Sequence, residues 1–181
     1  MSAPRPADAD LKIPAWGADG ALAPHGKLEV HEKGLRHPAI SVFVNGGGMT
    51  LLQRRAAGKY HTPGLWTNAC CTHPHWGEDM ADCARRRLRE ELGVDLPLVP
   101  RGEVEYRADV GGGLTEHEVV SIFVAEADPE TLRLAPDPAE VAEARWISWE
   151  DLRAEIAAAP ERFTPWVRIY LAEHEGMVLG D

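Results

Sequence analysis

Alternating apolar and polar positions predict a sheet built largely from hairpins. Five segments show strand-like patterns, at residues 39–44, 49–53, 103–109, 115–125 and 141–147. Asn45–Gly48 joins the first two segments, and Gly111–Gly113 joins the next two. Asparagine and glycine readily adopt the positive φ angles that tight turns require. Two antiparallel hairpins and one further strand are therefore expected.

Helical periodicity is clearest over residues 79–92. Acidic residues begin this segment, apolar residues recur at helical spacing within it, and Gly93 follows as a stop signal. Two later helices are expected at residues 149–158 and 164–175, the second with Pro165 in its first turn. Together with the strands, these helices predict a mixed α/β domain.

The N-terminal segment differs in composition from the rest of the chain. Residues 1–26 are rich in Pro, Ala, Gly and Asp, so we expect an irregular arm there, from which Trp16 could dock on the domain. Residues 27–181 contain no internal repeat and no second compositional zone. We expect them to form a single catalytic domain.

Composition and charge narrow the class of protein. The chain has 181 residues, of which 44% are hydrophobic, and this fraction is typical of a folded globule. The formal net charge of −10 argues against nucleic-acid or anionic-membrane binding, because both need a basic face. A local cluster of basic residues can still bind a small anion. No segment has the apolar length of a signal-peptide core or a membrane span.

The three cysteines are an odd number, and two of them are adjacent. Vicinal cysteines rarely form a disulfide, so we expect a cytoplasmic protein without a disulfide framework. Cys70 and Cys83 are expected to pack as small apolar residues. Cys71 stands two residues from His73, in a segment that Pro74 keeps out of a helix. Its thiol is therefore a candidate for chemistry.

Three histidines and two carboxylates form a candidate divalent-metal site: His31, His37, His73, Glu116 and Glu118. Strand alternation places Glu116 and Glu118 on one face. Such a mixed set suits an octahedral Mn²⁺, Mg²⁺ or Zn²⁺ ion with one position left for water or substrate. For His37, a surface position and a ligand role both remain open. The histidines at positions 25, 61, 75 and 174 are expected on the surface.

Arg87 and Glu91 are four residues apart and share one face of the predicted helix. One interpretation is a surface ion pair worth roughly 0.3–0.5 kcal/mol. The other is a binding site, in which Arg87 holds an anionic ligand and Glu91 its counter-cation. Lys27, Arg55 and Lys59 could join Arg87 in a phosphate clamp. Taken singly, each of these basic residues is better explained as a solvated surface residue.

A combination of motifs resembles the type 1 isopentenyl-diphosphate Δ-isomerase family of the Nudix fold. The motifs run in order from about residue 27 to 170: K-L-E-V-H, L-R-H, L-L-Q-R-R, P-G-L-W-T-N-A-C-C-T-H-P, W-G-E, R-R-L-R-E-E-L-G, E-Y-R-A, T-E-H-E and F-T-P-W. The resemblance implies a Nudix-type α/β/α sandwich with a mixed sheet and hairpins. It also implies an enzyme that interconverts isopentenyl and dimethylallyl diphosphate for isoprenoid biosynthesis.

The resemblance also implies roles for individual residues. Cys71 and Glu118 match the catalytic pair, and Tyr106 and Trp166 match aromatic residues of the pocket. The metal ligands fall on His31, His37, His73, Glu116 and Glu118, and Mg²⁺ bound with the diphosphate falls on Glu91 and the Cys71 carbonyl. The substrate-binding cations fall on Lys27, Arg55, Lys59 and Arg87. A small-molecule diphosphate is thus the expected partner, and a monomer or weak dimer the expected state.

A Nudix hydrolase of a diphosphate substrate is the main alternative. Such hydrolysis generally gathers several carboxylates around divalent ions at the bridging phosphate. Here Arg87 occupies the position of the first helix glutamate of the Nudix box, ahead of Glu90 and Glu91. A cation at that position favours the isomerase. A non-catalytic sensor is less well supported, because it would need the anion clamp but not the acid/base pair.

Overall fold

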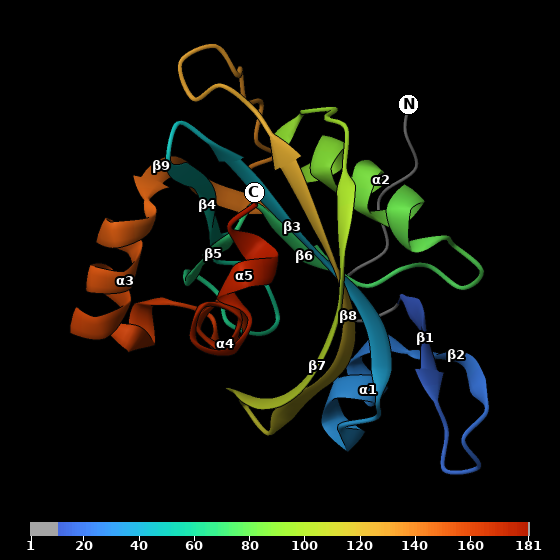
Figure 1. Ribbon diagram of the computed structural model, residues 1–181. Coiled ribbons are helices and arrows are strands. Elements are labelled where there is room, and N and C mark those ends of the chain that lie inside the picture. Colours follow the sequence, from blue (N-terminus) through green and yellow to red (C-terminus); the bar gives the residue numbers. More distant parts are fainter. Residues whose placement is uncertain (1–10, 181) are drawn as a thin grey trace.

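A seven-stranded mixed sheet is the central feature of the computed structural model, which describes residues 11–180 (Figure 1). Its strands are β3 (His37–Gly46), β4 (Met49–Arg55), β5 (Trp66–Asn68), β6 (Cys70–Thr72), β7 (Val99–Gly111), β8 (Leu114–Glu126) and β9 (Val141–Ser148). The order is β5-β4-β3-β8-β7, while β6 also pairs with β3 and β9 with β4. The β3–β8 pairing is parallel, and the other pairings in this sheet are antiparallel.

Helices cover both faces of this sheet. They are α2 (Met80–Leu92), α3 (Trp149–Ala158), α4 (Pro165–Glu173) and α5 (Glu175–Val178), with a 3₁₀ turn at Pro160–Arg162. In Figure 1, α2 lies on one side of the sheet, and α3, α4 and α5 lie on the other. Alternation along β3 supplies two cores, because Val42 packs on the α2 side and Phe43 on the opposite side. The expected α/β/α sandwich is confirmed.

The local elements agree closely with the sequence pattern. All five predicted strands and both predicted hairpins are present. Asp79 caps α2 by accepting hydrogen bonds from the backbone N–H groups of Ala81 and Asp82, and Gly93 ends the helix with φ 70°. The expected helix at 164–175 ends earlier, at Glu173, and the short helix α5 follows it.

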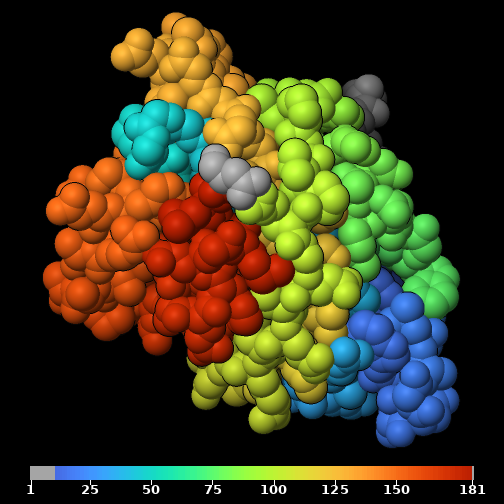
Figure 2. Space-filling view, in the orientation of Figure 1, coloured from blue at the N-terminus to red at the C-terminus, as the bar shows by residue number. Residues whose placement is uncertain are grey.

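The expectation of an irregular N-terminal arm was wrong for residues 11–26, while residues 1–10 lie outside the described residues. β1 (Lys12–Trp16) and β2 (Leu22–Gly26) form an antiparallel hairpin, which leads into α1 (Lys27–Lys33). The hairpin and α1 form one end of the molecule, in blue in Figure 2. Buried Ile13 packs with Val30 of α1, and the Arg36 guanidinium lies 4.3 Å from the centre of the Trp16 ring. These contacts are long-range, so composition alone does not reveal them.

No helix within residues 11–180 combines the length and apolarity needed to cross a membrane.

Candidate active site

A pocket that opens to solvent lies between β6, β8, the segment that follows β4 and the start of α4. It is lined by Lys27, Arg55, Lys59, Tyr60, His61, Cys71, Thr72, His73, Glu116, Glu118 and Trp166. The pocket brings together the predicted thiol, both predicted carboxylates and three of the predicted cations. Parallel pairing of β3 with β8 places His37 opposite Glu118, and pairing of β3 with β6 places Ser41 opposite Cys71. The sheet topology thus gathers residues from distant parts of the sequence.

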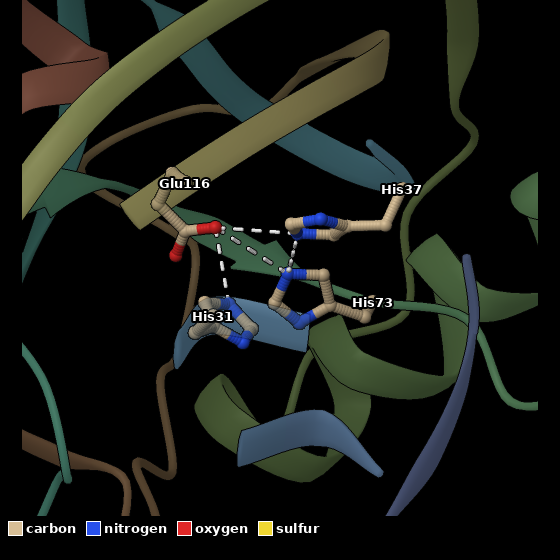
Figure 3. A group of neighbouring side chains, drawn as sticks. All are labelled: His31, His37, His73 and Glu116. Atoms are coloured by element: carbon tan, nitrogen blue, oxygen red, sulfur yellow. Dashed lines mark hydrogen bonds and ion pairs between the residues drawn. The ribbon is translucent and has the colours of Figure 1, made fainter. Parts of the chain in front are cut away.

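Four of the predicted metal ligands form a buried cluster (Figure 3). His31 comes from α1, His37 from the start of β3, His73 from the segment after β6, and Glu116 from β8. One ligand atom from each of the four lies within 4.8 Å of the others. Glu118, the fifth candidate, lies beside them, with its Oε1 atom 2.9 Å from His73 Nε2. Residues 31–37, residue 73 and residues 116–118 are distant in the sequence, yet they meet at one centre.

The arrangement of polar atoms in this cluster fits a divalent cation. Glu116 Oε2 lies 3.1 Å from His31 Nε2 and 3.3 Å from His37 Nε2, yet this buried oxygen makes no hydrogen bond of acceptable geometry. The Nε2 atoms of His37 and His73 face each other at 3.1 Å. A buried carboxylate oxygen without a hydrogen bond is costly, and facing imidazole nitrogens suit lone pairs directed at one ion.

Backbone carbonyls orient two of these histidines for metal binding. His31 Nδ1 lies 2.6 Å from the Lys27 carbonyl oxygen, and His37 Nδ1 lies 2.7 Å from that of Leu35. Because a carbonyl can only accept, each Nδ1 carries the proton and donates it. Burial lowers the pKa of His37, but the carboxylates of Glu116 and Glu118 outweigh it and raise the pKa to about 10. A bound divalent ion would displace the Nε2 proton of His37, and the Nε2 lone pairs of His31 and His37 would then face the ion. Burial lowers the pKa of His73 to about 3, so the His73 ring is neutral.

Glu118 and Tyr106 form a hydrogen-bonded pair across adjacent strands. Tyr106 lies opposite Glu118 in the β7–β8 register and donates its hydroxyl to Glu118 Oε2 at 2.6 Å. Burial, together with the charge of Glu118, raises the pKa of Tyr106 well above 10, so the phenol stays neutral. Burial and the charge of Glu116 raise the pKa of Glu118, but the neighbouring imidazoles of His37 and His73 outweigh them and lower it.

Cys71 is held at the edge of the pocket by side chains of β3 and β5. Its Sγ atom lies 3.0 Å from Asn68 Oδ1 and 3.0 Å from Ser41 Oγ. Burial raises the pKa of the Cys71 thiol to about 12, so the sulfur keeps its proton at neutral pH. Cys70 and Cys83 are fully buried in the core between α2 and the sheet, as expected. The adjacent side chains of Cys70 and Cys71 therefore lie on opposite faces of the sheet.

Lys27, Arg55 and Lys59, three of the predicted cations, line the pocket, and Trp166 forms part of its wall. The Lys27 ammonium lies 5.5 Å from the centre of the Tyr60 ring, and the Arg55 guanidinium lies 5.4 Å from that of Trp166. The Trp166 indole donates to Thr67 Oγ1 at 2.8 Å, which fixes the ring. Trp166 lies in the first turn of α4 and lines the pocket.

The interpretation of Arg87 and Glu91 as a surface ion pair was wrong. Their exposed fractions are only 8% and 5%, and Arg87 Nη2 lies 2.6 Å from Glu91 Oε1. Arg87 Nη1 lies 2.8 Å from Glu90 Oε2, and Gln53 donates to Glu91 Oε2 at 2.7 Å. Arg87 lines an adjacent cavity rather than the main pocket, and Lys27 lines both. The helix face is buried because it packs against the sheet.

Sequence reasoning missed Glu140, which links two of the predicted cations. Its Oε2 atom lies 2.5 Å from Lys59 Nζ and 3.2 Å from Arg87 Nη2. Glu140 stands just before β9 in a segment without a distinctive motif, and strand pairing with β4 brings it to the site. Its only sequence signal is a single acidic residue at a strand start, which is too common to be informative.

The expected surface position of His61 was also wrong. His61 is only 6% exposed, and its Nε2 atom lies 3.1 Å from Glu116 Oε1. His75 is exposed as expected, while His25 and His174 are partly exposed. The segment between β4 and β5 folds over the pocket and so buries a histidine that local polarity suggested was solvated.

Comparison with known proteins first shows the class of protein to which the chain belongs. Residues 35–167 match the family model described as NUDIX domain. Two solved structures show the same fold at low sequence identity. DR0079 from Deinococcus radiodurans has a TM-score of 0.70 at 17% identity and covers 92% of this chain and 98% of its own. A MutT NUDIX hydrolase from Burkholderia pseudomallei has a TM-score of 0.60 at 22% identity, covering 77% and 98%.

Curated relatives narrow the assignment within that class. Isopentenyl-diphosphate Delta-isomerase from Cereibacter sphaeroides (strain ATCC 17025) is 64% identical over 93% of this chain and 94% of its own length. The proteins of that name from Dinoroseobacter shibae and Rhodobacter capsulatus are 61% and 58% identical, over 93% and 94% of this chain and 95% and 96% of their own lengths. The chain belongs to the isopentenyl-diphosphate Delta-isomerase family of NUDIX-domain proteins.

Proposed function

We propose that this protein interconverts isopentenyl diphosphate and dimethylallyl diphosphate, and so acts in isoprenoid biosynthesis. One observation carries the proposal: Cys71 and Glu118 line the same pocket as Lys27, Arg55 and Lys59. An alkene isomerase needs two groups that exchange protons, and a diphosphate substrate needs cations. Membership of the isomerase family supports the same activity.

The reaction moves a double bond by adding one proton and removing another. A proton added to the terminal CH₂ carbon forms the new methyl group and leaves a tertiary carbocation. Loss of a proton from the neighbouring CH₂ then places the double bond next to the diphosphate-bearing carbon. We propose Cys71 and Glu118 as the two proton carriers, with Tyr106 passing a proton to or from Glu118 through their 2.6 Å hydrogen bond. The reaction is reversible, so the donor and the acceptor exchange roles with its direction.

The pocket wall suits a short-lived cation. The face of an indole stabilises a positive charge through its quadrupole, by about 2 kcal/mol where water is excluded. Trp166 lies in the wall and is held there by Thr67, so it is the proposed partner for the carbocation. A dry wall also keeps water from adding to the cation.

We propose that the substrate diphosphate binds Lys27, Arg55, Lys59 and Arg87. These side chains supply point charges and forked donors, which are the groups that phosphates require. Mg²⁺ carried by the diphosphate would be held by Glu91 and the Cys71 carbonyl. Each Glu91 oxygen accepts a single described hydrogen bond and retains a lone pair for such an ion. Neutralising the diphosphate keeps it from leaving the allylic product.

A second divalent ion is proposed at the centre formed by His31, His37, His73, Glu116 and Glu118. The convergent nitrogens and the unbonded Glu116 oxygen suit Mn²⁺, Zn²⁺ or Mg²⁺. When bound, this ion would hold Glu118 in place and stabilise its ionised form. It would also compensate the charge of two adjacent buried carboxylates.

We also propose a cytoplasmic location for the protein. All three cysteines are free thiols, which suits a reducing cytoplasm. We propose a monomer or weak dimer, because one chain supplies every residue of the proposed site. Light scattering at micromolar concentration would measure the assembly.

Isotope labelling tests the proposed function directly. Purified protein with Mg²⁺ and isopentenyl diphosphate in D₂O should yield dimethylallyl diphosphate with deuterium in one methyl group. Cys71→Ala should lower the rate by about 10²–10⁴-fold, the usual contribution of a general acid or base. Cys83→Ala is the matched control, because Cys83 lies on the buried face of α2 and does not line the pocket. Product without deuterium in the methyl group, or rapid release of phosphate in place of isomerisation, would exclude the proposal.

A further inference from the structure

His61 contacts the oxygen of Glu116 that faces away from the histidine cluster. Figure 3 shows one Glu116 oxygen directed toward His31, His37 and His73 and the other directed away from them. That second oxygen, Oε1, lies 3.1 Å from His61 Nε2. The four side chains whose ligand atoms all lie within 4.8 Å of one another do not include His61. His61 is therefore placed behind a ligand rather than among the ligands.

The neighbours of the other ring nitrogen show which tautomer His61 adopts. Its Nδ1 atom lies 3.5 Å from Arg55 Nη2 and 3.2 Å from Thr62 Oγ1. A guanidinium has no acceptor, so an Nδ1 atom that faces it presents a lone pair. The proton of the neutral ring is then on Nε2, where it is donated to Glu116. This tautomer is opposite to that of His31 and His37, whose Nδ1 atoms donate to carbonyl oxygens.

The His61 ring is held firmly in this position. Its backbone carbonyl accepts a hydrogen bond from Arg55 Nη2 at 3.1 Å, and its ring packs edge-on against Tyr60 and Trp166, with centroids 4.4 and 6.0 Å away. Thr62 has φ 45°, the one positive φ outside glycine in residues 11–180. A β-branched residue rarely adopts that conformation, so the surrounding contacts hold this segment against its local preference.

We propose that His61 is a positioning residue, which donates a hydrogen bond to Glu116 Oε1 and thereby directs Glu116 Oε2 toward the bound divalent ion. The proposal rests on the metal centre of the proposed function. Side chains that orient metal ligands commonly contribute 10–100-fold to metal affinity, because a free carboxylate must otherwise be ordered when the ion binds. His61 also contacts Arg55, so it holds in place both Glu116, a metal ligand, and Arg55, a residue proposed to bind the diphosphate.

Metal titration without substrate tests this role. Chelator-treated native protein and its variants would be titrated with Mn²⁺, and free Mn²⁺ measured by electron paramagnetic resonance. His61→Ala should weaken Mn²⁺ binding about 10–100-fold. His61→Gln should restore most of the affinity, because its amide N–H can replace the imidazole donor. If His61→Ala does not fold, His61→Met replaces it, since that side chain fills the space without a donor.

His117→Ala provides the matched control. His117 Nε2 also lies 3.1 Å from a carboxylate oxygen, Glu105 Oε1, but this pair is solvent-exposed on the opposite face of β8. Its loss should leave Mn²⁺ affinity unchanged. Equal affinity in native protein and in folded His61→Ala or His61→Met, or equally weak binding by His61→Gln and the donor-free variant, would overturn the positioning role. Native protein that binds Mn²⁺ but converts no isopentenyl diphosphate would instead overturn the proposed function alone.

Discussion

Replacing Arg87 by Ala should destabilise the fold strongly, because it removes the cation that pairs with two buried carboxylates, Glu91 and Glu140. The guanidinium contacts Glu90, Glu91 and Glu140 at 2.8, 2.6 and 3.2 Å, and it is only 8% exposed. Removing one partner of a buried pair usually costs about 3–5 kcal/mol, since the remaining charge stays desolvated. For a chain of this size, that cost corresponds to a fall in Tm of roughly 6–20 °C.

Arg89→Ala is a matched control on the same helix. Arg89 Nη2 lies 2.9 Å from Asp95 Oδ2, but the two side chains are 55% and 61% exposed. An exposed pair contributes about 0–1 kcal/mol. Both variants exchange Arg for Ala within α2, so intrinsic helix propensity changes by the same amount. The difference between them therefore isolates the effect of burial.

Urea unfolding followed by circular dichroism would measure both free energies, with the same chelator present for each protein. The slope of free energy against urea should stay constant, and the midpoint should fall much further for Arg87→Ala. A loss of stability below about 1 kcal/mol in Arg87→Ala, or one no larger than in Arg89→Ala, is typical of an exposed ion pair. Either result would refute the argument from burial.

Three further predictions concern the active site and acid stability. Tyr106→Phe removes a hydrogen bond to the charged Glu118, worth about 1.5–3 kcal/mol, so kcat should fall roughly 10–150-fold with KM little changed; an unchanged kcat would contradict this role. Burial raises the pKa of Cys71 to about 12, so its rate of alkylation by iodoacetamide should rise about tenfold per pH unit from pH 7 to 9; a plateau below pH 9 would show an ordinary thiol. Burial raises the pKa of Glu78, but hydrogen bonds from Arg86 outweigh it and lower the pKa from 4.5 to about 2. The Glu78 carboxylate therefore stabilises the fold above pH 4.5 and loses this effect as the pH falls toward 2, so the urea-unfolding penalty of Glu78→Gln should be smaller at pH 3.5 than at pH 7; equal penalties would refute it.

The predicted strands and helices were recovered well because their signals are local. The α2 helix has its cap at Asp79 and its stop at Gly93, and both act through hydrogen bonds or dihedral angles within a few residues. The glycine-rich turns work in the same way. Placement of Glu116 and Glu118 on one face also follows from strand alternation alone, and both side chains are buried as that pattern requires.

Residues whose environment depends on packing were predicted poorly. Charge and helical spacing placed Arg87 and Glu91 on one face correctly but could not show that this face packs against the sheet. His61 lies in a polar connection, where a solvated side chain is the ordinary expectation. The N-terminal hairpin is stabilised by contacts of Ile13 with α1 and of Trp16 with Arg36, which no local pattern specifies.

The sequence by itself determined the five strands and the helices with strong local signals, the shared face of the carboxylates and, through its motifs, the family resemblance. Only the tertiary structure decided which side chains meet. Parallel pairing of β3 with β8 places His37 opposite Glu118, and the fold carries His31 and His73 to the same centre from other segments. Local patterns act within a few residues, whereas a metal centre depends on strand register and burial, which are set by packing over the whole chain.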